Sequence, residues 1–156
     1  MARLLSILLF SMAAFGQSHP TIPDPKLTPG ATNPAVTQAT IKQTICKPGY
    51  TSTVRNVTEA EKKQVMQRYG LPLTDLHLLE IDHWESLEIG GSNDITNLWP
   101  QYYTGPSGYL GARQKDVIET SLHRQVCAGT ITLLQAQQEI HSWTTLYLEL
   151  KLQRSR

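Results

Sequence analysis

The stretch of residues 76–100 constrains the fold more than any other part of the chain. An apolar run at residues 76–81 is bounded by polar side chains, and this pattern predicts a strand. The alternating residues 87–89 predict a second short strand, and the glycine pair at residues 90–91 marks a turn. The sequence therefore predicts a small β-hairpin in the middle of the chain.

Helices are predicted on both sides of this hairpin. Thr58 and Glu61 have the spacing of a capping box, which predicts a helix over residues 58–69. Apolar residues at helical spacing predict two more helices, over residues 112–126 and 132–152. The expected fold class is therefore α+β and mostly helical.

The beginning of the chain has the pattern of a secretory signal peptide at residues 1–16. Arg3 precedes an apolar run that is too short to span a bilayer, and a small-residue cleavage pattern follows it. Residues 17–44 are rich in proline and predict an extended arm, which leaves residues 45–156 as one domain. We therefore expect a secreted or periplasmic protein without stable membrane association after cleavage.

Net charge restricts how the exported chain could bind nucleic acid. The full sequence has 14 Lys and Arg and 13 Asp and Glu, and loss of Arg3 with the signal peptide leaves 13 of each. A protein that holds nucleic acid through its phosphates usually has a basic excess, so tight passive binding is disfavoured. A hydrolase that uses a bound cation and a local basic patch is still compatible with this charge.

The chain has two cysteines, Cys46 and Cys127. Export favours a disulfide between them, and the alternative is a pair of buried free thiols. Two cysteines alone are too few for a zinc site, which needs three or four ligands.

Asp82 and His83 are the residues that point most directly to chemistry. Hydrolysis of a phosphodiester needs an activated water and relief of charge on the phosphate. A neutral histidine can accept the proton from water, and a neighbouring carboxylate can bind a cation. Neighbours on a regular strand point to opposite faces, so the two residues can share a site only if the strand ends or bends there.

The order of motifs around this pair resembles the HNH, or ββα-metal, nucleases, most closely exported bacterial HNH-like proteins. That pattern has an Asp-His pair, a Gly-Gly turn, an Asn-Leu step and then a helix, with a Cys-x-Pro-Gly-Tyr segment before it and a Val-Cys-x-Gly segment after it. The matching residues are Asp82-His83, Gly90-Gly91, Asn97-Leu98, Cys46-Lys47-Pro48-Gly49-Tyr50 and Val126-Cys127-Ala128-Gly129. The resemblance implies a ββα-metal core of a hairpin and a helix, flanked by further helices.

The resemblance also implies roles for individual residues. His83 would be the general base, Asp82 would ligate a divalent cation, and Asn97 would fix the loop that orients the base. The cofactor would be Mg²⁺ or a transition metal such as Zn²⁺, Mn²⁺ or Ni²⁺. The substrate would be nucleic acid, DNA in preference to RNA.

The sequence departs from the family pattern at the helix. Ala112 stands where the last metal ligand is expected, and alanine cannot bind a metal. Asp116 and Glu119 share a helix face and could complete a metal site with Asp82. Lys115 could hold a phosphate, or it could form an ordinary i,i+4 pair with Glu119.

This departure and the zero net charge leave a second interpretation open. The chain would then be a non-catalytic exported protein that keeps an HNH-like scaffold for binding or structure. A third interpretation is an exported protein whose core recognises another protein, with the proline-rich arm at residues 17–44 as the contact.

Overall fold

A computed structural model describes residues 21–104 and 109–155 of the chain, and it confirms the α+β, mostly helical fold class. The described residues form five α-helices, several 3₁₀ turns and one two-stranded antiparallel sheet. The signal peptide predicted at residues 1–16 lies outside the described residues. Within them, no helix has both the length and the apolar character needed to cross a bilayer.

The sheet is built from β1 (Leu79–His83) and β2 (Leu98–Tyr102). The strands are antiparallel, with Leu79 opposite Tyr102 and His83 opposite Leu98. The predicted first strand began too early, because residues Leu73–Leu78 form a 3₁₀ helix, η1.

The predicted second strand was wrong. Residues Leu87–Ile89 form a single 3₁₀ turn, η2, inside the long connection between β1 and β2. The Ser86 side chain accepts a hydrogen bond from the Glu88 backbone N–H at its start, and Gly90 ends it with φ +88°. One turn buries Leu87 and Ile89 while leaving Glu88 more exposed, so it produces the same alternation as a strand.

Gly91 fits this connection because the chain approaches itself there. A Cβ atom on Gly91 would lie 1.8 Å from the carbonyl oxygen of Glu85, which no side chain can tolerate. The absence of a side chain lets the Gly91 N–H donate to the Ser86 carbonyl at 2.8 Å.

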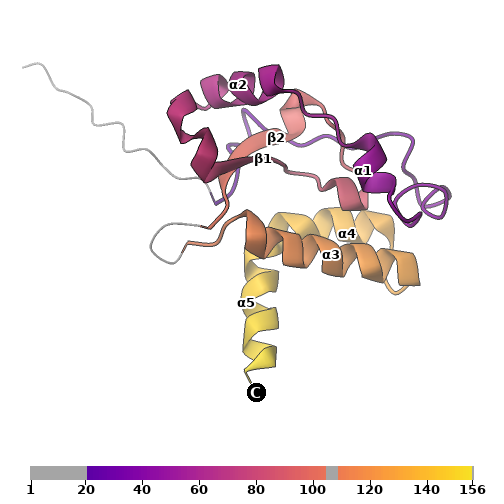
Figure 1. Ribbon diagram of the computed structural model, residues 1–156. Coiled ribbons are helices and arrows are strands. Elements are labelled where there is room, and N and C mark those ends of the chain that lie inside the picture. Colours follow the sequence, from indigo (N-terminus) through magenta and orange to yellow (C-terminus); the bar gives the residue numbers. More distant parts are fainter. Residues whose placement is uncertain (1–20, 105–108, 156) are drawn as a thin grey trace, which may run out of the picture.

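The two faces of the sheet pack against different helices (Figure 1). Leu79, Ile81 and Leu98 pack on one face against Val65 and Met66 of α2 (Glu59–Arg68). On the other face, Trp99 joins a larger apolar cluster with α3 (Ala112–Ala128) and α4 (Leu133–Glu139). The hairpin is therefore the middle layer of three.

The predicted helices around the hairpin are largely confirmed. The capping box at Thr58 and Glu61 begins α2, and α3 begins at Ala112 as expected. The last predicted helix is broken in two, because residues Ile140–Ser142 form a 3₁₀ turn, η5, before α5 (Trp143–Arg154). The break lets Ile140 and Trp143 both reach full burial, and α5 then projects away from the body of the molecule (Figure 1).

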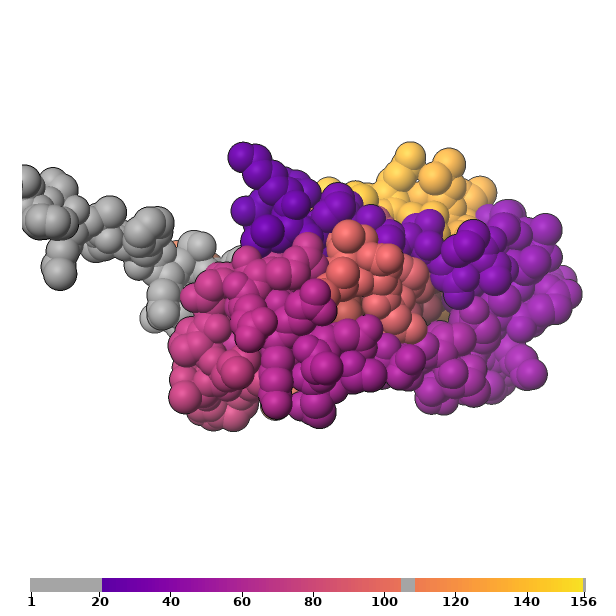
Figure 2. Space-filling view, turned by 90° about the horizontal axis from the view of Figure 1, so that it is seen from above, coloured from indigo at the N-terminus to yellow at the C-terminus, as the bar shows by residue number. Residues whose placement is uncertain are grey.

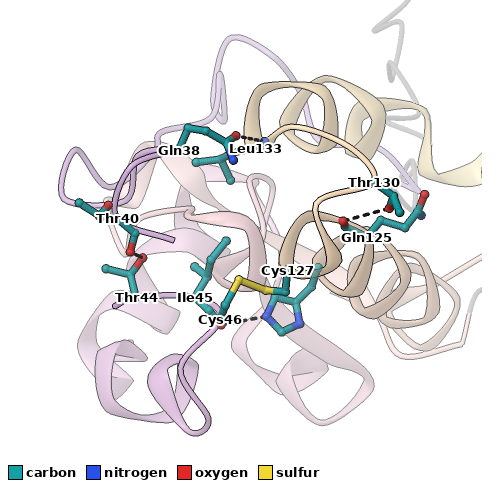
Figure 3. Close-up of a disulfide and its surroundings, with 10 residues drawn as sticks. Gln38, Thr40, Thr44, Ile45, Cys46, Gln125, Cys127, Thr130 and Leu133 are labelled. Carbon is teal, nitrogen blue, oxygen red and sulfur yellow. Dashed lines mark hydrogen bonds between the residues drawn. A yellow bond between two sulfur atoms is a disulfide. The ribbon is translucent and has the colours of Figure 1, made fainter. Parts of the chain in front are cut away.

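The predicted extended arm has irregular structure, but it packs against the rest of the protein. Its described part buries Thr28, Val36 and Ile41, and α1 (Tyr50–Val54), which the sequence had not predicted, follows it. The arm lies along the connection between the strands, and residues just before β2 lie at the surface between the arm and α2 (Figure 2). A disulfide between Cys46 and Cys127 joins its far end to α3, which confirms that prediction (Figure 3).

Removing the disulfide should lower the free energy of unfolding substantially. The bridge spans 81 residues, and a loop of that length contributes at most about 4–5 kcal/mol on the chain-entropy model. Urea denaturation of Cys46→Ala/Cys127→Ala should show this loss, and wild type with its disulfide reduced should lose a similar amount. An unchanged free energy of unfolding would contradict the stabilising role of the bridge.

Candidate functional site

Lys115 is the centre of the cluster that the sequence pointed to. Its side chain is fully buried, and its ammonium forms ion pairs with Asp82 Oδ2, at 2.9 Å, and with Glu119. It also donates a hydrogen bond to the backbone carbonyl of His83 at 2.8 Å. The Lys115 side chain of α3 therefore holds the end of β1 at two points, the side chain of Asp82 and the backbone of His83.

The charged side chains in this cluster shift one another's pKa values. Burial alone would lower the pKa of Lys115, but the carboxylates of Asp82 and Glu119 outweigh it and raise that pKa above its ordinary value. Burial and the charge of Asp82 together raise the pKa of Glu119 to about 7, against the opposing charge of Lys115. Two buried carboxylates thus share one ammonium.

Two further acids lie near this cluster. Burial raises the pKa values of Glu80 and Asp116, and the negative charge of Asp82 raises both further. The positive charge of Arg55 opposes these shifts at both residues. Glu80 is partly buried and Asp116 is exposed, so this is the side on which the cluster meets solvent.

His83 is held on the opposite side of the strand by a different partner. Its Nε2 lies 3.0 Å from Asn93 Oδ1, and Asn93 Nδ2 donates to the Val54 carbonyl at 2.7 Å. Since the Val54 bond fixes the amide orientation, Asn93 Oδ1 is an acceptor and His83 Nε2 carries the proton. His83 Nδ1 therefore keeps its lone pair.

Nothing among the described residues hydrogen-bonds to this Nδ1 atom, although it is buried. Burial lowers the pKa of His83, outweighing the Asn93 bond and the charge of Asp82, which raise it. The imidazole is therefore neutral at pH 7. A buried nitrogen with a free lone pair is uncommon and requires an explanation, such as a bound water or a catalytic role.

Asn97 closes the connection between the strands. Its side chain accepts from the Glu85 backbone N–H at 2.8 Å and donates to the carbonyls of Glu85 and Ser92. A weaker contact at 3.3 Å comes from the N–H of Ala31 in the arm. Asn97 is fully buried and so fixes the loop that carries Asn93 toward His83.

The structure thus brings some of the predicted site residues together and separates others. Lys115 links Asp82, His83 and Glu119. Asn97 instead holds the backbone of the connection between β1 and β2. The three acids predicted as metal ligands, Asp82, Asp116 and Glu119, do not form a group with ligand atoms close enough for one ion.

A different group in the described part of the chain does have metal-ligand spacing. One potential ligand atom from each of Cys46, His123 and Cys127 lies within 4.8 Å of the others, although the two sulfurs are joined in the disulfide. Sequence reasoning missed this group because it counted only the cysteines.

A surface groove runs beside β1 on the side that faces α2. Its volume is about 650 Å³, and its lining includes Arg55, Lys62, His77, Glu80 and Tyr103. Both signs of charge and one exposed tyrosine are present. The groove reaches Ile81, two residues before His83.

Sequence reasoning also missed the role of Asn93. The residue lies in the motif that suggested the resemblance, but its contact with His83 depends on how residues 90–97 fold back over the strand end. In the sequence, the only indication of this role was the position of Asn93, a polar residue between a glycine turn and Asn97.

Comparison with known proteins adds no assignment, because no protein family, curated protein or solved structure matches the chain.

Replacing Lys115 should strongly destabilise the chain at neutral pH. Lys115→Met leaves two carboxylates buried without their cation, and breaking a buried pair in this way costs about 3–5 kcal/mol. Lys62→Met is the matched control, since Lys62 pairs with the exposed Glu59 and the substitution should leave stability nearly unchanged. Urea denaturation measures both, and equal small effects would show that the Lys115 cluster contributes little.

Glu119 should give the folded chain a distinct pH dependence. Its folded-state pKa of about 7 lies above its ordinary value of 4.5, so the folded chain holds a proton that the unfolded chain releases. Its contribution to the free energy of unfolding therefore falls as pH rises from 4.5 to 7. Glu119→Gln should remove that fall in a pH series of urea denaturations, and an identical slope in the variant would contradict the assignment.

Proposed function

We propose that the chain hydrolyses phosphodiester bonds of nucleic acid, with His83 as the general base. The observation that carries this proposal is the neutral imidazole of His83, whose Nδ1 lone pair is buried without a partner among the described residues. The hairpin of β1 and β2 together with α3 would be the ββα core that the sequence resemblance implies.

The chemistry assigned to His83 follows from its hydrogen bonding. A water placed at Nδ1 would transfer a proton to that nitrogen as its oxygen attacks phosphorus. Asn93 keeps Nε2–H engaged throughout, so the ring cannot rotate or change tautomer. The charge of Asp82 favours the imidazolium that forms.

The groove beside β1 would take the substrate. Arg55 and Lys62 offer positive charge to phosphates, and Tyr103 offers a ring on which a base can stack. The exported chain has no basic excess overall, so binding would depend on this local patch. DNA is the preferred substrate in this proposal.

The predicted divalent cation does not fit its predicted ligands as these side chains are arranged. The Lys115 ammonium is bound to both Asp82 and Glu119, and Asp116 does not join them in a ligand group. A divalent cation therefore takes no part in the step proposed for His83.

The buried ammonium of Lys115 also favours a second candidate function. A non-catalytic exported protein could keep the HNH-like scaffold, with Lys115 replacing a metal as the positive centre that joins β1 to α3. Export to the periplasm or the exterior belongs to both proposals, and the disulfide is compatible with an oxidising compartment.

Cleavage of nucleic acid decides between the two candidates. Mature protein should nick plasmid DNA, with RNA tested in parallel, and each reaction should be run with Mg²⁺, Mn²⁺, Ni²⁺, Zn²⁺ and a chelator. His83→Ala should cut at least about 100-fold more slowly, because it removes the general base. Since burial lowers the pKa of His83, the acid limb of the wild-type rate profile should lie below pH 6.5.

His123→Ala is the matched control, because it removes an imidazole on the far part of α3, next to Ile45, and should keep full activity. Cutting that survives His83→Ala would refute the assigned base. A folded wild type that cuts neither DNA nor RNA under any of these conditions would favour the non-catalytic scaffold.

A further inference from the structure

We propose that Cys46, Cys127 and His123 form a zinc-type metal site when their disulfide is reduced. The two sulfurs and one nitrogen of the imidazole lie within 4.8 Å of one another. In the described part of the chain, no other three histidine, cysteine or acidic residues have this spacing.

Two of the three ligands come from one face of α3. His123 and Cys127 are four residues apart in the helix, so their side chains lie next to each other. The third ligand comes from the loop that carries Cys46, which crosses the end of α3 (Figure 3). His123 Nε2 donates to the carbonyl of Ile45, the residue before Cys46, at 2.8 Å. The imidazole is therefore held between the two cysteine-bearing segments.

The loop has anchors that do not depend on the disulfide. Ile41 and Ile45 are buried in the same apolar cluster as Val126 of α3. The Cys46 N–H donates to the Ile41 carbonyl at 2.9 Å, which fixes the local turn. Gln38 Oε1 also accepts from the Leu133 N–H at 2.7 Å, at the start of α4 (Figure 3). Reduction of the disulfide therefore leaves Cys46 close to Cys127.

A reductant can reach the bridge. Cys127 is exposed, and Cys46 and His123 are partly exposed. A depression of about 570 Å³, lined by Ile41, Lys42 and Cys127 among others, opens beside the bridge. A dithiol reductant would transfer two electrons and two protons to the bridge, giving two thiols and its own cyclic disulfide.

The resulting ligand set suits Zn²⁺. Two thiolates and one imidazole are ligands of tetrahedral zinc, and a water would take the fourth position. Binding would release the two thiol protons. With Zn–S bonds of about 2.3 Å, the sulfurs would lie roughly 3.8 Å apart. The Cα atoms are 5.5 Å apart, so rotation of the two side chains can provide that separation.

The site would therefore depend on redox state. The oxidised chain has no thiolate to offer, and the same residues then form a covalent link. In the reduced chain, a metal ion would join the Cys46 loop to α3 in place of the covalent bond. This inference does not rest on the proposed hydrolase, because the group lies at the opposite end of α3 from Lys115.

Cobalt spectroscopy tests the site directly. Mature protein that is reduced with a dithiol and then freed of the reductant without air should bind one Co²⁺ per chain, with thiolate-to-cobalt charge-transfer absorption and the intense visible bands of tetrahedral cobalt. Zn²⁺ should displace the cobalt and raise the thermal midpoint of the reduced chain. Oxidised protein should show none of these signals.

Two variants complete the test. Reduced His123→Ala should lose the tetrahedral bands, whereas reduced His77→Ala, which removes an exposed imidazole from η1, should keep them. If reduction unfolds the chain, Zn²⁺ must restore helical circular dichroism to wild type and His77→Ala but not to His123→Ala. Absence of thiolate bands in reduced wild type, or identical bands in His123→Ala, would overturn the proposal, as would zinc that fails to restore the fold.

Discussion

The buried ammonium of Lys115 is the contact on which the centre of the molecule depends. It joins α3 to the end of β1 through the side chain of Asp82 and the backbone of His83, and it neutralises Glu119 on its own helix. A charge without water around it is stable only when such partners surround it. A single lysine therefore fixes the position of the β1 end, including the backbone of His83.

The parts of the fold that the sequence predicted are those set by local interactions. The capping box at Thr58 and Glu61 and the start of α3 depend on residues within one or two turns, so their patterns were sufficient. The disulfide was also predictable, because the chain has only two cysteines. None of these features required knowledge of distant contacts.

The errors arose where long-range packing outweighed local pattern. Leu87 and Ile89 alternate like a strand, but Ser86 and Gly90 close a single turn instead, and the true partner strand comes later. The last helix breaks at Ser142, while the neighbouring His141 stacks on Trp84 and pairs with Glu85. Such contacts between distant segments leave no local signature.

For the candidate site, the sequence identified the residues but not their arrangement. Asp82, His83 and Lys115 were all singled out, yet whether Lys115 pairs with acids or holds a phosphate depends on how close α3 lies to the strand end. The tautomer of His83 depends on Asn93, whose orientation is fixed by the Val54 carbonyl. These properties depend on four segments that are brought together in space: β1, α3, α1 and the connection before β2.

The disulfide has a topological consequence as well. Cys46 and Cys127 enclose both strands, α2 and nearly all of α3 within one covalent ring. A protease that cuts the backbone once inside this ring cannot separate the two pieces, which stay joined at the bridge. A chain nicked once inside the ring would therefore keep both fragments in a single covalent molecule.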